Sequence, residues 1–135
     1  MTTAATISLD AGWLCEYFET DPDLFEFAAG GQPVSSLREW ACSGRYDTNW
    51  AAWLQRRFDL PPTDFCVRYT LHVDAAPGGT VLYLNGRRMG TIEGTQPFSF
   101  DVTDYVTLDD NQIAFRAGCE GGRFGWVFLR QHPCE

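Results

Sequence analysis

Residues 81–103 read VLYLNGRRMGTIEGTQPFSFDVT, a stretch in which apolar runs alternate with turn signals. Asn85-Gly86 stands between two of these runs. This dipeptide is the strongest short-range signal for a β-hairpin, because both turn residues must adopt positive φ. The sequence therefore predicts a strand over 80–84 and a return strand over 89–92. A third strand follows, with three side chains expected on its inner face: Phe98, Phe100 and Val102.

Apolar alternation continues on both sides of this stretch. Residues 65–74 (FCVRYTLHVD) place five apolar side chains on one face, as in a half-buried antiparallel strand. Further strands are expected within 7–18 and over 53–60, 112–117 and 125–130. Two segments are less regular: 36–40 fits a strand or one helical turn, and 45–49 fits a loop. Many short strands spaced by about 8–12 residues are typical of a β-sandwich or jelly roll.

The composition excludes several classes of function. The 135 residues correspond to a single domain, 1–135. A net charge of −8 argues against a nucleic-acid partner, because phosphate binding needs a basic stripe. Every basic residue other than histidine is arginine, so Schiff-base chemistry on lysine is excluded. No apolar run approaches the roughly 18 residues that a membrane span requires.

The cysteine pattern indicates reduced thiols. There are five cysteines, none of them at Cys-x-x-Cys spacing, so neither a disulfide framework nor a structural zinc site is expected. We interpret them as mostly buried small apolar residues, with Cys134 as a candidate exposed thiol. Residues 1–7 lack the features of a secretory signal. The sequence therefore predicts a cytoplasmic protein.

Together, these motifs resemble a known family. Residues 81–103 follow a pattern of apolar strand, Asn-Gly, Gly, Pro-Phe and Phe-Asp-Val-Thr. This is similar to the galactose-binding-like, sugar-binding domain at the N-terminus of family 2 glycoside hydrolases, the β-galactosidase and β-glucuronidase type. Other segments resemble that domain in the same order: 9–13, 36–40, 53–61 and 109–117. The resemblance covers nearly the whole chain and implies an all-β fold, an antiparallel jelly-roll β-sandwich.

The resemblance does not imply catalysis by this chain. Enzymes of that family carry their two catalytic glutamates on a separate (β/α)₈ barrel, and such a barrel needs about 250 residues. Glycoside hydrolysis requires two carboxylates across the bond that is cut, and the sequence singles out no pair among its 18 acidic residues. It also has no Gly-x-Ser-x-Gly or His-Glu-x-x-His motif. We therefore expect no catalytic residue and no enzyme acting alone.

Two loops carry side chains suited to sugar binding, because aromatic rings stack on sugar rings and planar polar groups bond hydroxyls. The first loop supplies Tyr46, Asp47, Asn49 and Trp50. The structural alternative is that Trp50 packs in the core and Tyr46 caps the edge of the sandwich. The second loop supplies Arg123, Phe124 and Trp126, for which packing at a strand edge is the alternative.

The loop after the hairpin adds two polar candidates, Glu93 and Gln96. In the resembling family this loop reads Gly-Tyr-Thr-Pro-Phe and reaches toward the barrel, whereas here 94–98 read GTQPF. The missing aromatic weakens the expectation of a substrate contact at this loop. Other prominent residues are expected to be structural: Asp101 at a strand corner, Arg57 in an ion pair, and Trp13, Trp40 and Trp53 in the core.

These residues predict a non-catalytic carbohydrate-binding or accessory module. The alternative is a structural or protein-interaction module that forms a homodimer or docks to a separate glycosidase subunit, without binding sugar itself. No cofactor and no metal-ligating residue is expected. The carboxylates of the acidic stretch 16–26 suit a structural calcium ion, but this stretch lacks an Asp-x-Asp-x-Asp-Gly loop.

Overall fold

The computed structural model describes residues 5–18, 31–41, 51–93, 96–118 and 122–134. Within them lie ten strands and two short 3₁₀ helices. The strands are β1 (Ala5–Ser8), β2 (Trp13–Phe18), β3 (Gln32–Val34), β4 (Ala51–Phe58), β5 (Val67–Val73), β6 (Thr80–Leu84), β7 (Arg87–Ile92), β8 (Phe98–Asp101), β9 (Asn111–Ala117) and β10 (Val127–Pro133). The 3₁₀ helices are η2 (Leu37–Glu39) and η3 (Thr103–Tyr105).

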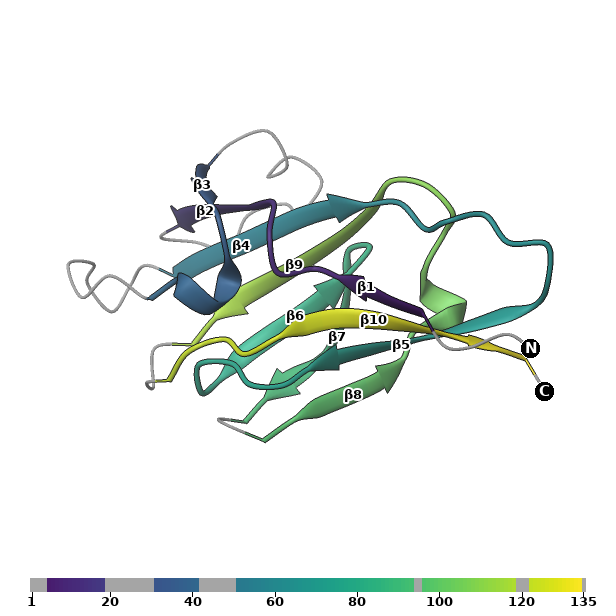
Figure 1. Cartoon of the computed structure of the whole chain (residues 1–135). Coiled ribbons are helices and arrows are strands. Elements are labelled where there is room, and N and C mark those ends of the chain that lie inside the picture. The colour runs from purple at the N-terminus through teal and green to yellow at the C-terminus, as the bar shows by residue number, and fades with distance from the viewer. Residues whose placement is uncertain (1–4, 19–30, 42–50, 94–95, 119–121, 135) are drawn as a thin grey trace.

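The strands form two antiparallel sheets that pack face to face (Figure 1). The four-stranded sheet has the order β1-β10-β5-β8, and the six-stranded sheet has the order β3-β2-β4-β9-β6-β7. This arrangement confirms the predicted all-β sandwich. None of the helices in the described part of the chain has the length and hydrophobicity needed to cross a membrane.

The core lies between the two sheets. The six-stranded sheet contributes Trp13 and Phe115, whose rings stack with centroids 5.3 Å apart. The four-stranded sheet contributes Leu71 and Leu129, which are almost completely buried. The predicted inner face of 65–74 is therefore confirmed, except for Phe65. This residue precedes the first paired residue of β5 and is 46% exposed.

All three tryptophans expected in the core are buried, but not together. Trp13 and Trp40 belong to the main cluster between the sheets. Trp53 belongs to a second cluster on the opposite face of β4, where it packs against Tyr83 with ring centroids 5.4 Å apart. Since β4 and β9 are central strands, side chains on both of their faces are buried, and simple alternation does not distinguish the two clusters.

The predicted hairpin is confirmed at the Asn85-Gly86 turn. Both residues have positive φ, 50° and 79° respectively, and the turn joins β6 to β7. The Asn85 side chain also makes two hydrogen bonds. Its Nδ2 donates to the Tyr105 carbonyl at 2.8 Å, and its Oδ1 accepts from the Gln112 backbone amide at 2.8 Å. The turn is thereby joined to η3 and to β9.

The first half of the chain differs from the expectation of one strand within 7–18. That segment contributes to two strands, because β1 pairs with β10 in one sheet and β2 pairs with β4 in the other. The chain therefore crosses between the sheets at residues 9–12. For 36–40 the helical alternative is correct, as η2. The predicted loop 45–49 lies outside the described residues.

The prediction of reduced cysteines is wrong for one pair. Cys66 and Cys134 form a disulfide, with Cα atoms 5.3 Å apart. The reason is strand register: Val67 pairs with Pro133, and the Cys134 amide donates to the Cys66 carbonyl at 3.0 Å, so the two cysteines lie opposite each other. Cys15 is buried, as expected. The two other cysteines, Cys42 and Cys119, lie outside the described residues.

Candidate functional site

Several connections between strands meet at one end of the sandwich. Val127 pairs with Val73, and Val73 pairs with Phe98, so the chain segments next to these residues are neighbours. The Asp74 amide donates to the Trp126 carbonyl at 2.9 Å, which continues the pairing by one residue. We call this the loop end and define it by residues 74–79, 96–97 and 122–126.

Trp126 is the large aromatic side chain exposed at the loop end, with 48% of its surface accessible. The guanidinium carbon of Arg38 lies 3.5 Å from the centroid of its ring. This is a close cation–π contact, and it covers one face of the indole. The exposed surface of Trp126 therefore belongs to the other face and to the ring edges.

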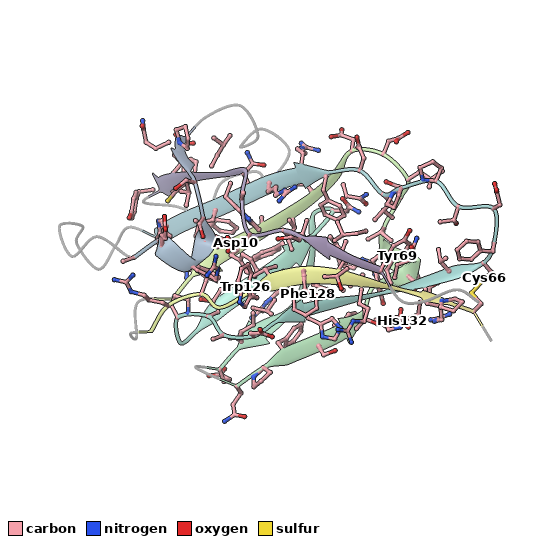
Figure 2. All side chains as sticks on the ribbon, in the orientation of Figure 1. Asp10, Cys66, Tyr69, Trp126, Phe128 and His132 are labelled. Atoms are coloured by element: carbon pink, nitrogen blue, oxygen red, sulfur yellow. A yellow bond between two sulfur atoms is a disulfide. The ribbon has the colours of Figure 1, made fainter. Side chains whose placement is uncertain are left out.

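Asp10 holds Arg38 in this position. Its carboxylate accepts hydrogen bonds from Arg38 Nε at 3.2 Å and from the Ser36 hydroxyl at 2.7 Å. Asp10 is only 9% exposed, and its carbonyl accepts from the Leu37 amide at 2.9 Å, so η2 is joined to the β1–β2 connection. Figure 2 shows Asp10 and Trp126 close together above the start of β10.

This arrangement produces an ordered aromatic platform. An indole that is fixed by a stacked guanidinium loses little side-chain entropy when a flat ligand binds to it. Its exposed surface suits the apolar face of a ring, and the Arg38 N–H groups that are not bonded to Asp10 suit hydroxyl or other oxygen acceptors. Such a site can bind and orient a ligand.

The structure places three predicted site residues at the loop end. Gln96, Arg123 and Trp126 are exposed there, and Glu93, which directly follows β7, is also exposed. Phe124 does not line the site: it is 3% exposed and packs on Phe115 and Trp40 with ring centroids 5.0 and 5.9 Å away. For Phe124, the packing alternative is correct. The other predicted residues, Tyr46, Asp47, Asn49 and Trp50, lie outside the described residues.

The two residues expected to be structural polar contacts are confirmed. Asp101 accepts a hydrogen bond from the Thr103 amide at 3.0 Å and pairs with Arg68 at 2.8 Å. The hydrogen bonds from Thr103, supported by Arg68, lower the pKa of Asp101 to about 2. Arg57 pairs with Asp110 at 3.4 Å. Both pairs are exposed and lie away from the loop end.

Sequence reasoning missed Arg38 and Asp10 as parts of a site. Each lies in a segment, 36–40 or 9–13, that resembles the family domain but carries no motif of a binding site. The two residues are 28 positions apart, and no local pattern indicates that η2 folds back onto the β1–β2 connection. The only local signals for these two residues are that Asp10 precedes a turn and that Arg38 lies two residues before Trp40.

A separate pocket of about 510 Å³ lies beside the edge formed by β2 and β3. Its lining includes Cys15, Glu16, Tyr17, Gln32 and Trp40. None of the described candidate residues lines this pocket. Within the described residues, no group of three or more His, Cys, Asp or Glu side chains could hold a metal ion.

Comparison with known proteins identifies solved structures that contain the same fold. No protein-family model and no curated protein sequence matches the chain. Solved structures do match: a β-glucuronidase of Bacteroides uniformis has 19% identity and a TM-score of 0.70 over 97% of this chain. A β-glucuronidase of Faecalibacterium prausnitzii has 16% identity and a TM-score of 0.73 over 96% of this chain.

A third match names the enzyme family. It is a glycosyl hydrolase family 2 member of Bacteroides cellulosilyticus, with 17% identity and a TM-score of 0.70 over 95% of this chain. The chain has the fold of a small domain of family 2 glycoside hydrolases. This chain corresponds to 18%, 32% and 21% of the three solved chains, respectively. It therefore spans less than a third of those enzymes, and most of their length has no counterpart in it.

Proposed function

We propose that this protein is a non-catalytic module that binds carbohydrate at its loop end. The observation that carries the proposal is the Trp126 platform, an exposed indole held in place by Arg38 and Asp10. Sugar-binding sites combine a rigid aromatic surface with a few polar groups around it. Glu93, Gln96 and Arg123 are the polar residues proposed to contact the sugar, and Tyr46, Asp47, Asn49 and Trp50 remain proposed ligand-binding residues.

The test is a titration of the purified protein with mono- and oligosaccharides, including galactosides and glucuronides. Binding is followed by the indole N–H signals of the five tryptophans in NMR spectra. We expect the Trp126 signal to shift, and Trp126→Ala to weaken binding by roughly 3- to 10-fold, since an aromatic contact contributes about 0.5–1.5 kcal/mol. Thermal melts of the variants show whether they remain folded.

Phe65→Ala is the matched control. Phe65 is also an exposed aromatic residue, 46% accessible, but it precedes β5 at the opposite end of the sandwich. The Phe65→Ala variant should bind every sugar as tightly as the unmodified protein does. If no saccharide shifts the Trp126 signal at tens of millimolar, or if both variants bind equally well, the loop end is not a sugar site.

The alternative is a structural module that contacts another protein. Two exposed apolar side chains favour it: Phe65 at 46% and Leu108 at 61% accessibility. They lie in the β4–β5 and η3–β9 connections, which meet through the hydrogen bond from the Leu60 amide to the Leu108 carbonyl at 2.7 Å. Native mass spectrometry of the protein, alone and with a candidate glycosidase subunit, tests this. Phe65→Ser with Leu108→Ser should disrupt a complex formed through this end.

The disulfide bears on the compartment in which the protein works. The predicted cytoplasmic location relied on reduced cysteines, whereas stable disulfides are typical of oxidising compartments. The Cys66–Cys134 bond therefore favours an oxidising compartment. Mass spectrometry of the protein isolated from its native source, with free thiols alkylated before lysis, shows whether Cys66 and Cys134 are reduced or bonded in the cell. This result distinguishes the cytoplasm from an oxidising compartment.

A further inference from the structure

The outer face of the four-stranded sheet extends the surface that begins at Trp126. Alternate residues of a strand point to the same face, so Phe128, Arg130 and His132 of β10 lie on the side away from the core. Their neighbours Val127 and Leu129 are buried between the sheets. Figure 2 shows Trp126, Phe128 and His132 in succession along β10. A strand rise of about 3.3 Å per residue puts Trp126 and Arg130 roughly 13 Å apart.

The centre of this face is an aromatic patch formed by two stacked rings. Phe128 pairs in register with His72 of β5, and the two rings stack with centroids 4.9 Å apart and planes 10° from parallel. The neighbouring positions on the adjacent strands carry hydroxyls, since Ser8 of β1 pairs with Phe128 and Ser99 of β8 pairs with His72. A pair of stacked rings flanked by two serines therefore spans three strand boundaries.

Arg130 lies beside this patch and carries its positive charge. Its guanidinium is 5.9 Å from the Phe128 ring centroid, and it is exposed. Its partners in register, Thr6 and Thr70, are both neutral. Among the described residues, no carboxylate lies within ion-pair distance of it, unlike the arginines at 38, 57 and 68.

The aromatic partner of Phe128 is neutral under ordinary conditions. Burial lowers the pKa of His72, and the nearby charge of Arg130 lowers it further. At neutral pH the patch is therefore an uncharged surface with one unneutralised guanidinium at its side. An exposed arginine without a partner is available for a planar anionic group on a ligand.

We propose that the outer face of the four-stranded sheet binds a saccharide chain that carries anionic groups, with a sugar ring over Phe128 and His72 and a carboxylate or sulfate on Arg130. This inference rests on the proposed carbohydrate binding and names the ligand class and the direction of the chain along β10. The ligand is an oligomer, because the distance from Trp126 to Arg130 exceeds the size of one sugar ring.

The net charge of −8 does not prevent such binding. At physiological ionic strength the Debye length is about 8 Å, so distant acidic side chains are largely screened. Several acidic residues lie near this face. Asp101 pairs with Arg68, on which Asp104 also acts, and Asp74 lies past His72, at the loop end. The charge of Arg130 therefore acts at short range. It affects which ligand binds more than it affects the association rate.

The experiment compares three oligosaccharides of equal length by calorimetry: a neutral galacto-oligosaccharide, a carboxylated oligogalacturonide and a sulfated oligosaccharide. We expect at least one anionic oligomer to bind more tightly than the neutral one. Arg130→Ala should weaken the anionic binding by about two- to fivefold, as expected for an exposed charge pair, without changing the neutral binding. Arg88→Ala, an exposed arginine of the other sheet, is the matched control and should change neither. Which of the two anionic oligomers binds identifies the group that Arg130 recognises.

Other results separate this inference from the proposed function. Equal binding of all three oligomers, or anionic binding that Arg130→Ala leaves unchanged, overturns the anionic ligand. If Trp126→Ala still weakens that binding, carbohydrate binding at the loop end stands. If none of the three oligomers and no other saccharide binds, both proposals fail. NMR shifts that fall outside β5, β10 and the loop end place the site elsewhere and overturn the inference.

Discussion

At the scale of single residues, Asn111 shows how a buried polar side chain organises a corner of this sandwich. It is fully buried, and its Nδ2 donates to the Thr107 carbonyl at 2.7 Å. Its Oδ1 accepts from the Thr107 amide at 2.8 Å and from Asn85 Nδ2 at 3.1 Å. The turn before β9 and the β6–β7 turn therefore share one amide group.

Asn111→Ala should lower the free energy of unfolding by about 2–3 kcal/mol, because Asn111 is fully buried and its removal leaves the Thr107 backbone groups and the Asn85 amide without their partner. Chemical denaturation monitored by tryptophan fluorescence measures it. Asp109→Ala is the control, because Asp109 is exposed two residues away and a surface change of this kind stays within about 0.5 kcal/mol. Equal effects of the two substitutions would contradict the role given to Asn111.

Asp101 predicts a pH dependence of stability. Its pKa is lowered to about 2 in the folded protein, from an unfolded value of about 3.9. The carboxylate therefore contributes stability above about pH 4, and this contribution is lost as the pH falls toward 2. Thermal melts between pH 2 and 5 should show a shallower pH dependence for Asp101→Asn. An NMR titration in which Asp101 has an ordinary pKa would refute this.

The sequence predicted isolated residue roles better than residue pairs. The Asn85-Gly86 turn and the corner role of Asp101 follow from local rules, and both are confirmed. The contact of Arg38 with Asp10 could not be predicted, because the partners are 28 residues apart and meet only after the chain has crossed between sheets. The exposure of Trp126 could be anticipated, but not the guanidinium stacked on it.

At the scale of the strands and their connections, the end of β9 passes very close to the β5–β6 connection. A Cβ atom added at Gly118 would overlap the Gly78 carbonyl and stand 2.7 Å from its carbon. Because these are backbone atoms of Gly78, they cannot move without displacing the β5–β6 connection. The Gly118 amide also donates to the Thr80 hydroxyl at 3.1 Å. Glycine at this position therefore allows the loop end to close.

Gly118→Ala should destabilise the protein by about 3 kcal/mol or more, as expected when overpacking meets backbone. Gly86→Ala is the comparison: its cost should be about 1 kcal/mol, from positive φ alone at an exposed turn. Thermal and chemical denaturation of both variants tests this order. If Gly118→Ala is the milder change, the close approach does not restrict the fold.

Strand positions were predictable where one face is buried and the other is wet. Apolar alternation located β5, β6 and β9 within two residues of their ends. It did not separate β1 from β2, because apolar residues run through both while the hydrogen-bond partners change from β10 to β4. Nor could it place Trp53 on the outer face of β4, since both faces of that strand are buried.

At the scale of the whole molecule, the disulfide closes the end of the four-stranded sheet opposite Trp126. Cys134→Ser should lower the free energy of unfolding by about 2–4 kcal/mol, since the bond closes a long loop in the unfolded chain; the two cysteines are 68 residues apart. Reducing the unmodified protein should produce the same loss, and reductant should not change Cys134→Ser. Identical melting of oxidised and reduced protein would contradict this.

The sandwich as a whole was predictable because its motifs occur in the same order as in the resembling domain. The disulfide was not, because the spacing of cysteines in a sequence does not show which strands pair. Only the register of β5 with β10 puts Cys66 opposite Cys134. The candidate surface on the four-stranded sheet depends on the same register, which aligns Phe128 with His72.

The disulfide also changes the topology of the polypeptide. Residues 66–134 form a covalent ring that contains β5 to β10, whereas the segments before it form an open tail. A protease that nicks one connection inside the ring, for example after Arg123, linearises the ring but releases nothing. The two fragments separate only after reduction. A cut in the tail, for example after Arg38, leaves a fragment that only non-covalent contacts hold, including the packing of Trp13 on Phe115.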